Sequence, residues 1–419
     1  MNINEILKGV KCTACGRVHE CPIEKVYIES DATKHLPELC ERFKSILLVA
    51  DENTYGVSGE SVEREIGDKI RDRVIFSGKT ILIPDERAIV QIDAKMQDVD
   101  LIVGIGSGVI QDLCKYESKM FSTPYIIVAT APSMDGYAST VAAMILKGMK
   151  ETVSSAGLPL AIVADTEVLK NAPSEMLMAG YGDIIGKYSA LNDWKLSREI
   201  NGEYFCQYIY DVISSMLEKT LDAAKGLMER DEKSVKALTE ALVVVGIMMS
   251  FATNSRPASG SEHHLSHFFE ITGIVNEEPY FPHGIDVAYS TVIAAKLRED
   301  ILKKTFPAKQ YKENADEYLA NMKKIYASVA DGCIALQKKL GTYETDRLSL
   351  YKAKESEIRK ILAEMPSASE IERMLSLVGL DMREFYDTYG EEKIANAIKY
   401  AKDLKDRFTV LWMNYDLGE

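Results

Sequence analysis

The sequence predicts an α/β domain with a parallel sheet, followed by a domain that is built only of helices. In the first 170 residues, short continuous apolar runs alternate with helical patterns, which is typical of buried parallel strands and their crossover helices. After about residue 170 the strand signal fades, and long helical patterns continue to the end of the chain. We therefore expect domains at 1–170 and 171–419, with a short cysteine-containing segment at 1–30.

Each expected strand is a short apolar run without the spacing of a helical face. The runs are 45–50, 79–83, 100–105, 125–129 and 160–163. Helices are expected at 85–97 and 109–120, between successive strands. In the second half, helical patterns cover 174–199, 204–228, 234–252, 261–269 and 286–298. Residues 302–365 are rich in Lys and Glu, which indicates helices with solvated faces.

The composition is that of a folded protein with an acidic surface. Of the 419 residues, 46% are hydrophobic and 27% are charged, and the formal net charge is −14. Such a charge argues against binding along a nucleic-acid backbone. We expect no apolar run of the roughly 20 residues that span a bilayer and no signal peptide, and the low density of cysteines indicates reduced thiols. We therefore expect a cytoplasmic protein without nucleic-acid or membrane partners.

A glycine-rich segment, 104–108, lies between an expected strand and an expected helix. Glycines let the backbone approach a ligand closely, and the N-terminus of the next helix offers N–H groups to a pyrophosphate. The candidate nucleotide contacts in and near this loop are Gly104, Gly106, Ser107, Gly108 and, after the strand at 45–50, Asp51. Asp51 is placed where an acid accepts bonds from a ribose, which would favour NAD over NADP. The alternatives are a plain tight turn for the loop and a helix cap for Asp51.

Two further segments carry polar residues where chemistry is expected. The segment 130–139 follows a strand and includes Thr130, Ser133, Asp135 and Ser139, which suits either ligand contact or a polar turn with helix caps. Further along, Asp183 and Lys187 lie four residues apart, the spacing of an ordinary exposed ion pair. Their apolar, glycine-rich surroundings favour burial, and buried carboxylates are usually paired or bound to a metal.

Four of the six histidines fall between residues 263 and 283. Neutral imidazole is the commonest metal ligand and a proton carrier near neutral pH. His263 and His267 are four apart and share one helical face, and His283 arrives from a later segment, whereas His264 points about 100° away and is left out. Upstream, Arg256 is a fixed positive charge that suits a carboxylate or phosphate, or that anchors a loop.

A second group of soft ligands lies near the N-terminus. Cys12, Cys15, His19 and Cys21 fall within ten residues, which is compatible with a structural zinc site. The alternative is a short hairpin that carries thiols, because compact zinc sites usually take their ligand pairs from segments further apart.

Taken together and in order, these motifs resemble the iron-containing alcohol dehydrogenase/dehydroquinate synthase-like superfamily. Within it, the chain is similar to the glycerol-1-phosphate dehydrogenases, especially their AraM-like bacterial branch. The segments that carry the resemblance are 103–108, 133–139, 182–187, 192–194, 255–263 with His267, 282–284, 406–411 and the N-terminal cysteine segment. One departure is Ile105, where the family usually shows a third consecutive glycine.

The resemblance implies a Rossmann-like α/β domain followed by a helical metal domain, as in dehydroquinate synthase. It implies reversible NAD(P)H-dependent reduction of dihydroxyacetone phosphate to sn-glycerol 1-phosphate, with one divalent zinc, nickel or iron ion as Lewis acid. The metal-ligand positions are matched by Asp183, His263 and His283. The residues expected to act in catalysis or substrate binding are His267 as proton donor, Asp135 and Lys187 beside the substrate, and Arg256, with Lys187, at its phosphate.

Three other functions stay open from the sequence. One is a dehydrogenase for an uncharged polyol such as glycerol, which needs no phosphate clamp. Another is a lyase of the dehydroquinate synthase type, in which the first ligand position usually carries Glu, so that Asp183 argues against it. A non-catalytic relative is disfavoured by the intact Asp/His/His set. A homodimer or higher homo-oligomer is the default expectation for a soluble enzyme.

Overall fold

The computed structural model describes residues 2–146, 149–153 and 157–418. The chain forms two compact units, and neither is continuous in sequence. The first unit comprises Met1–Ile184 and Glu218–Ser255, and the second comprises Ile185–Leu217 and Arg256–Glu419. Helix α9 (Gln207–Met228) passes from one unit to the other at residue 217. The expected linear boundary near residue 170 is a different kind of division and stays a prediction.

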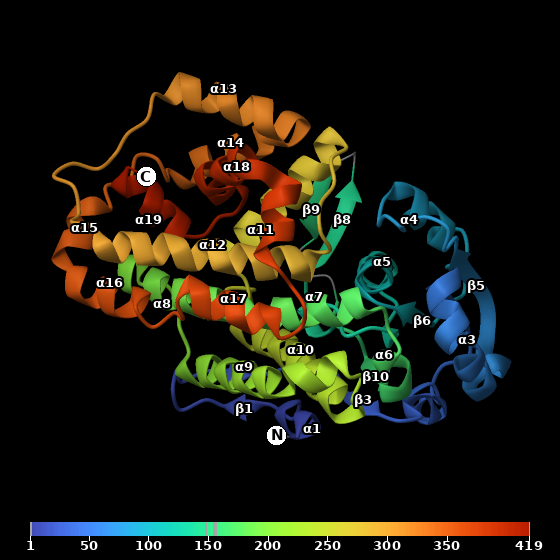
Figure 1. Ribbon diagram of the computed structural model, residues 1–419. Coiled ribbons are helices and arrows are strands. Elements are labelled where there is room, and N and C mark those ends of the chain that lie inside the picture. Colours follow the sequence, from blue (N-terminus) through green and yellow to red (C-terminus); the bar gives the residue numbers. More distant parts are fainter. Residues whose placement is uncertain (1, 147–148, 154–156, 419) are drawn as a thin grey trace. The chain divides into compact units, whose positions relative to one another are not determined.

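The first unit is built on a six-stranded sheet in which every neighbouring pair of strands is parallel (Figure 1). The order across the sheet is β3-β10-β7-β6-β4-β5. The strands are β3 (Lys25–Glu29), β4 (Ile46–Asp51), β5 (Ile70–Phe76), β6 (Leu101–Gly106), β7 (Tyr125–Ala129) and β10 (Ala161–Asp165). Two short antiparallel hairpins, β1 (Val10–Lys11) with β2 (Val18–His19) and β8 (Ala142–Leu146) with β9 (Met149–Val153), belong to the same unit.

Four of the five expected strands are confirmed as the central strands β4, β6, β7 and β10. The strand expected at 79–83 is wrong, because those residues form no strand and Ile81 is 90% exposed. Its place in the sheet is taken by the edge strand β5, which alternates exposed and buried residues and includes Arg71, Asp72 and Arg73. An edge strand solvated on one face does not read as a continuous apolar run.

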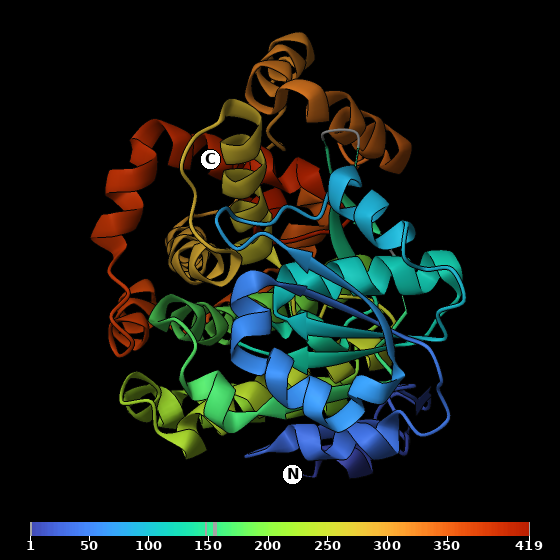
Figure 2. The same ribbon diagram turned by 90° about the vertical axis from the view of Figure 1, so that its right-hand side faces the viewer.

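Helices cover both faces of the sheet. Val103 and Ile105 of β6 pack in the core cluster with Val62 and Ile66 of α3 (Glu52–Ile66). Successive side chains of a strand point to opposite faces, and Gly104 faces Cys114 of α5 (Gly108–Phe121) instead. Figure 2 shows α3 and α5 on opposite sides of the strands. Shorter helices complete this part of the unit: α1 (Ile3–Ile6), α2 (Leu36–Leu39), α4 (Glu86–Asp93) and α6 (Thr166–Lys170).

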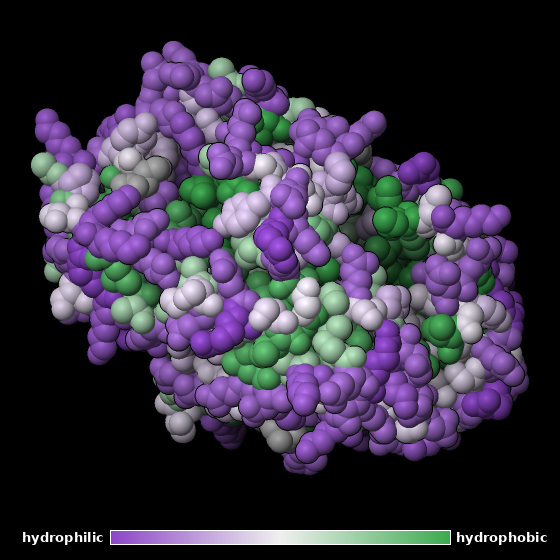
Figure 3. All heavy atoms as spheres, viewed as in Figure 1, coloured by the Kyte–Doolittle hydropathy of each residue, from purple (hydrophilic) through white to green (hydrophobic). Residues whose placement is uncertain are grey.

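Helix α10 (Glu232–Ala252) is the most apolar long helix of the first unit. By length and composition it could cross a membrane, which corrects the expectation that no apolar run is long enough. However, 78% of its apolar 18-residue window is buried inside the protein, as in a core helix. A Cβ on Gly246 would lie 2.8 Å from the carbonyl oxygen of Asp135, so this helix packs directly on the segment that follows β7. The face drawn in Figure 3 is mostly hydrophilic, in agreement with the acidic composition.

In the second unit the described residues form helices and connecting segments but no strand, which confirms the helical half. The helix expected at 174–199 is two helices, α7 (Ser174–Ile185) and α8 (Lys187–Asn201), that meet at Gly186. Beyond α11 (Ser261–Asn276) and α12 (His283–Lys303), the helices are α13 (Ala315–Tyr326), α14 (Ala330–Leu340), α15 (Leu348–Ala353), α16 (Glu355–Leu362), α17 (Ala368–Ser376), α18 (Met382–Tyr400) and α19 (Val410–Leu417). Short 3-10 turns, such as η3 (Asp135–Ala138) in the first unit, complete the chain.

Candidate active site

The expected glycine loop lies at the topological switch point of the sheet. From β4 the chain moves outward to the edge strand β5 and then returns to form β6 on the other side of β4. Parallel α/β sheets bind ligands beyond the carboxyl ends of the two strands at which the order reverses. Asp51 ends β4 and the loop 104–108 ends β6, so both stand at the position where such sheets bind nucleotides.

Two of the loop glycines are required by packing. A Cβ on Gly106 would lie 2.6 Å from the Cβ of Ile110, and a Cβ on Gly104 would lie 2.7 Å from the Sγ of Cys114. Both neighbours belong to α5, so the glycines let this helix start directly at the end of β6. At Gly108 a Cβ would meet only the side chain of Met134, at an ordinary 3.9 Å. The Ile105 side chain points into the core on the other face of the sheet.

Asp51 caps a helix. Its Oδ1 accepts bonds from the backbone N–H groups of Asn53 (2.8 Å) and Thr54 (2.9 Å), and the Thr54 hydroxyl accepts the N–H of Asp51 at 3.1 Å. This reciprocal pair is a capping box at the start of α3. The cap holds the carboxylate at the end of β4, and a ribose contact by Asp51 stays a prediction.

The polar segment after β7 is held by two side chains of α5. The Gln111 amide donates to the carbonyl of Tyr137 at 3.2 Å. The Lys115 ammonium contacts the carbonyls of Gly136 (3.2 Å) and Val141 (2.8 Å) and the hydroxyl of Ser139 (3.4 Å). Lys115 is fully buried, and this burial lowers its pKa although nearby carboxylates oppose the shift. Sequence reasoning missed both residues, whose only signal is that they lie four apart on the inner face of a helix.

The expected residues of this segment lie close to the glycine loop. The Ser133 and Ser107 hydroxyls are 2.5 Å apart, and the N–H of Thr130 donates to the carbonyl of Gly106 at 3.2 Å. Thr130, Ser133 and Ser139 are each less than a tenth exposed. These bonds fix the end of β7 beside the end of β6.

Asp183 and Asp135 meet in the first unit. The carboxylate of Asp183 is fully buried on α7, and its Oδ2 accepts the backbone N–H of Asp135 at 2.9 Å. Burying an ionised carboxylate is costly unless it is paired or coordinated. The sequence-based expectation of a buried Asp183 is therefore met, and the residue is tied to the turn that carries Asp135.

In the second unit, three histidine rings converge. His263 and His267 project from α11, and His283 begins α12, directly after Pro282. The ring centroids are 5.2 Å apart for His263 and His283, 5.5 Å for His267 and His283, and 6.1 Å for His263 and His267. The shared helical face expected from the i,i+4 spacing is thus present.

A buried carboxylate orients His263. The Nδ1 of His263 lies 2.7 Å from Oε1 of Glu262, and the same oxygen accepts the N–H of Gly260 at 2.7 Å. Glu262 is fully buried. A carboxylate on one ring nitrogen holds the other for a metal and raises its basicity. Sequence reasoning missed Glu262, because adjacent residues on a helix give no spacing signal.

The histidine cluster offers a second ligand set within the same unit. Ligand atoms of His267, Glu270 and His283 lie within 4.8 Å of one another, and all three residues are half-buried. The sequence contains this set as an i,i+3 pair on α11 with a histidine from the next helix, but Glu270 was not expected. It competes with the ligand set implied by the family resemblance.

Arg256 belongs to a buried basic cluster. Its guanidinium donates to Glu203 at 2.7 Å and to the carbonyl of Phe408 at 2.9 Å. Two cations from the region of the chain before α19, Lys405 and Arg407, bond the hydroxyl and carbonyl of Ser259. Burial first, and then Lys405, Arg407 and Arg256, hold the pKa of His264 well below its ordinary value. Lys405 and Arg407 were not expected from the sequence.

Burial and the nearby Arg256 also lower the pKa of Arg407, to about 10. Neither ring nitrogen of His264 has a hydrogen-bond partner among the described residues, and the ring is fully buried. This agrees with its exclusion from the expected site. Lys187 is fully buried as well, and its ammonium donates to the carbonyl of Ala258 at 3.1 Å.

The comparisons with known proteins agree with this arrangement. Residues 27–173 match the family model described as iron-containing alcohol dehydrogenase. A glycerol-1-phosphate dehydrogenase [NAD(P)+] of Halalkalibacterium halodurans is 29% identical over 98% of each chain. One of Geobacillus thermodenitrificans is 31% identical over 74% of this chain and 78% of its own, and an archaeal one, of Sulfurisphaera tokodaii, is 34% identical over 58% and 69%.

Among solved structures, the fold is that of iron-containing dehydrogenases. A probable glycerol dehydrogenase from Sinorhizobium meliloti superposes with a TM-score of 0.62 at 16% identity, over 94% of this chain and 95% of its own. An iron-containing alcohol dehydrogenase from Thermococcus thioreducens gives 0.60 at 13% identity, over 94% and 98%. The chain therefore belongs to the glycerol-1-phosphate dehydrogenase family, among the iron-containing alcohol dehydrogenases.

Proposed function

We propose that this protein interconverts dihydroxyacetone phosphate and sn-glycerol 1-phosphate with NAD(P)H or NAD(P)+ as the second substrate. The observation that carries the proposal is the match to a glycerol-1-phosphate dehydrogenase [NAD(P)+] along 98% of both chains. The enzyme is proposed to be cytoplasmic and homo-oligomeric.

The proposed metal ligands are Asp183, His263 and His283, with zinc, nickel or iron as the ion. The chemistry of these residues fits a divalent cation. Asp183 is a fully buried carboxylate, and the rings of His263 and His283 have centroids 5.2 Å apart. Glu262 holds Nδ1 of His263, which leaves Nε2 of that ring to a metal.

When bound, the reduced nicotinamide supplies the hydride, and the metal polarises the carbonyl that receives it. The protein's own groups position the reactants. Backbone N–H groups at the start of α5 are suited to the cofactor pyrophosphate, next to the hydroxyls of Ser107 and Ser133. Lys115 and Gln111 fix the turn that presents Asp135 and Ser139.

His267 is proposed to donate the proton to the developing alkoxide. Its ring belongs to the convergent cluster and is half-buried, so it can exchange protons with water. For the substrate phosphate we propose Arg256 and Lys187, two buried cations in an acidic protein. The neighbouring Lys405 and Arg407 strengthen the positive potential around Arg256.

The test is a chiral product assay with dihydroxyacetone phosphate, NADH or NADPH, and a panel of divalent metals. Formation of sn-glycerol 1-phosphate is expected, and formation of the 3-phosphate would reject the stereochemistry. Faster reduction of dihydroxyacetone than of its phosphate would instead identify a polyol dehydrogenase. Arg256→Ala should impair only the phosphorylated substrate. Phosphate release without net NADH consumption would identify a lyase.

A variant series separates the two possible ligand sets. Asp183→Asn and His263→Ala should each lose the metal and the turnover, whereas Glu270→Gln should keep both. The reverse pattern would assign the metal to His267, Glu270 and His283. Turnover retained by metal-free His263→Ala would reject the mechanism altogether.

A further inference from the structure

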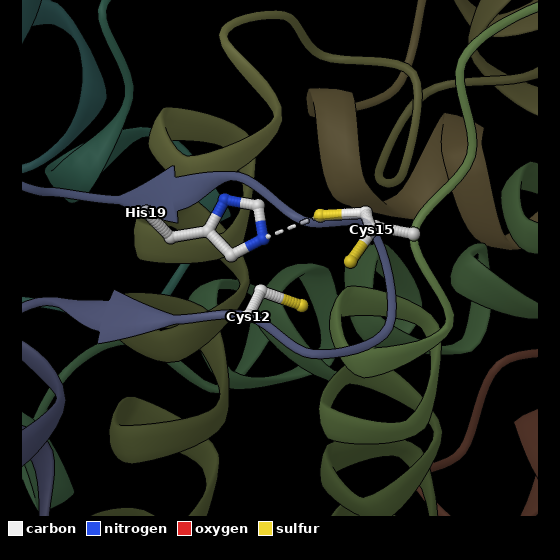
Figure 4. A group of neighbouring side chains, drawn as sticks. Cys12, Cys15 and His19 are labelled. Atoms are coloured by element: carbon white, nitrogen blue, oxygen red, sulfur yellow. Dashed lines mark hydrogen bonds between the residues drawn. The ribbon is translucent and has the colours of Figure 1, made fainter.

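The N-terminal hairpin carries a cluster of soft ligands that the proposed reaction does not use. Strands β1 and β2 pair antiparallel, and the tight turn between them contains Cys12 and Cys15. The N–H of Gly16 donates to the carbonyl of Cys12 at 2.9 Å, and the φ of +72° at Gly16 is one that glycine adopts without strain. This turn directs both thiols and the ring of His19 toward one point (Figure 4).

The spacing of these side chains matches metal coordination. The metal-binding atoms of Cys12, Cys15 and His19 lie within 4.8 Å of one another, and Sγ of Cys15 is 3.4 Å from Nε2 of His19. In a tetrahedral zinc site, bonds of about 2.3 Å to sulfur and about 2.05 Å to nitrogen place these two ligand atoms about 3.5 Å apart. The Cys15–His19 edge therefore already has the length that zinc would impose.

The His19 ring is held in the tautomer that a metal requires. Its Nδ1 lies 3.1 Å from the carbonyl oxygen of Phe251 at the end of α10. A carbonyl only accepts, so Nδ1 carries the proton, and the lone pair of Nε2 faces the thiol of Cys15. The ring is also stacked on Phe251, with centroids 5.2 Å apart and planes 9° apart. A backbone carbonyl on the far nitrogen is the usual outer-sphere support of a ligating histidine.

A hydrogen bond from the Cys15 thiol to His19, or a dithiol pair with a redox role, is the competing explanation. All seven cysteines are thiols. Cys12 is only 5% exposed and His19 only 1%, which disfavours thiol–disulfide exchange with a partner protein. Cys21, which the sequence suggested as a fourth member, does not belong to the cluster, and its thiol interacts with Ser250 instead.

We propose that Cys12, Cys15 and His19 hold one zinc ion in a structural site, separate from the catalytic metal. On binding, each thiol releases its proton to solvent, and a further protein or water donor completes the tetrahedron. The ion would anchor the hairpin to the last turn of α10 through His19 and the Phe251 carbonyl. Since α10 packs against the turn at Asp135, this anchor supports the nucleotide-binding unit. The proposal does not depend on the proposed reaction.

The experiment is cobalt substitution of the full-length protein, followed by absorption spectroscopy. Thiolate-to-cobalt charge transfer gives a strong near-ultraviolet band, which the oxygen and nitrogen ligands of the proposed catalytic set cannot produce. We expect this band in the wild type and in His263→Ala. Its absence from both proteins would overturn the proposal, whatever the folding of the cysteine variants.

Cysteine variants then locate the band. Cys12→Ser/Cys15→Ser should lose it, together with one metal equivalent per chain, and His19→Cys should retain it because a thiolate replaces the imidazole. Cys21→Ser is the matched control, since this thiol is in the same segment and is equally buried, 5% exposed. A band that persists in the double variant, or that disappears with Cys21→Ser alone, would place the metal elsewhere and refute the assignment.

Discussion

Gly106→Ala and Gly108→Ala separate the packing role of the glycine loop from its proposed role in cofactor binding. The Cβ of alanine at position 106 would lie 2.6 Å from Cβ and Cγ1 of Ile110. Those atoms are next to the backbone of α5, so they cannot move away without shifting the helix. Over-packing of this kind costs about 1–3 kcal/mol of unfolding free energy.

Gly108→Ala is the matched variant two residues away. The added Cβ would meet only Met134, at 3.9 Å, so the packing is undisturbed. Gly108 is the first residue of α5, where alanine is a better helix former than glycine by at most about 1 kcal/mol. The stability of this variant should therefore equal or slightly exceed that of the wild type. The methyl group would, however, occupy the surface that the pyrophosphate is proposed to approach.

The assay combines denaturant unfolding, followed by circular dichroism, with NADH and NADPH titration. Gly106→Ala should lower the unfolding midpoint, whereas Gly108→Ala should keep the midpoint and weaken cofactor binding by about tenfold or more, equivalent to about 1.4 kcal/mol. A wild-type midpoint for Gly106→Ala would refute the packing argument. A wild-type cofactor affinity for Gly108→Ala would refute pyrophosphate binding at this loop.

Three further predictions follow from buried charges. Glu262→Gln should weaken metal binding by about 10–100-fold, measured by chelator competition, because the carboxylate on His263 is lost; unchanged affinity would contradict this role. Lys115→Met should cost about 1–3 kcal/mol and reduce turnover, whereas exposed Lys119→Met on the same helix should stay within about 0.5 kcal/mol of the wild type; equal unfolding midpoints would be contrary evidence. Burial raises the pKa of Glu117 from 4.5 to about 9, so the folded state holds this proton and Glu117 contributes a loss of stability as pH rises through that window. Glu117→Gln should therefore stabilise the protein more at pH 8 than at pH 5, and a gain independent of pH would exclude the titration of Glu117 as its cause.

The central strands were predictable because strands covered on both faces are continuous apolar runs. The edge strand β5 was not, because its solvated face carries charged residues that break the run. The break between α7 and α8 at Gly186 was also missed, since the apolar pattern continues through it. Local periodicity reports burial along one element and does not report where an element ends.

At the site, spacing predicted the residues that act in pairs on one face, such as His263 and His267. It did not predict residues whose role is to hold others. Glu262 is adjacent to His263 in sequence, and Lys115 bonds carbonyls more than 20 residues away. Such contacts depend on how distant segments pack, which no pattern within one helix encodes. The thiol cluster was expected as four residues, but three of them converge within the hairpin and Cys21 turns away.

The chain crosses between its two units three times, after Ile184, Leu217 and Ser255. This interleaving has a consequence for biosynthesis. A nascent chain that has emerged as far as residue 184 already contains the whole six-stranded sheet but lacks α10, against which the turn at Asp135 packs. The sheet unit therefore completes only when residue 255 has left the ribosome, and until then it displays apolar surface suited to chaperones. Fragments that end near residue 184 should aggregate, so the nucleotide-binding half cannot have been exchanged in evolution as a simple N-terminal module.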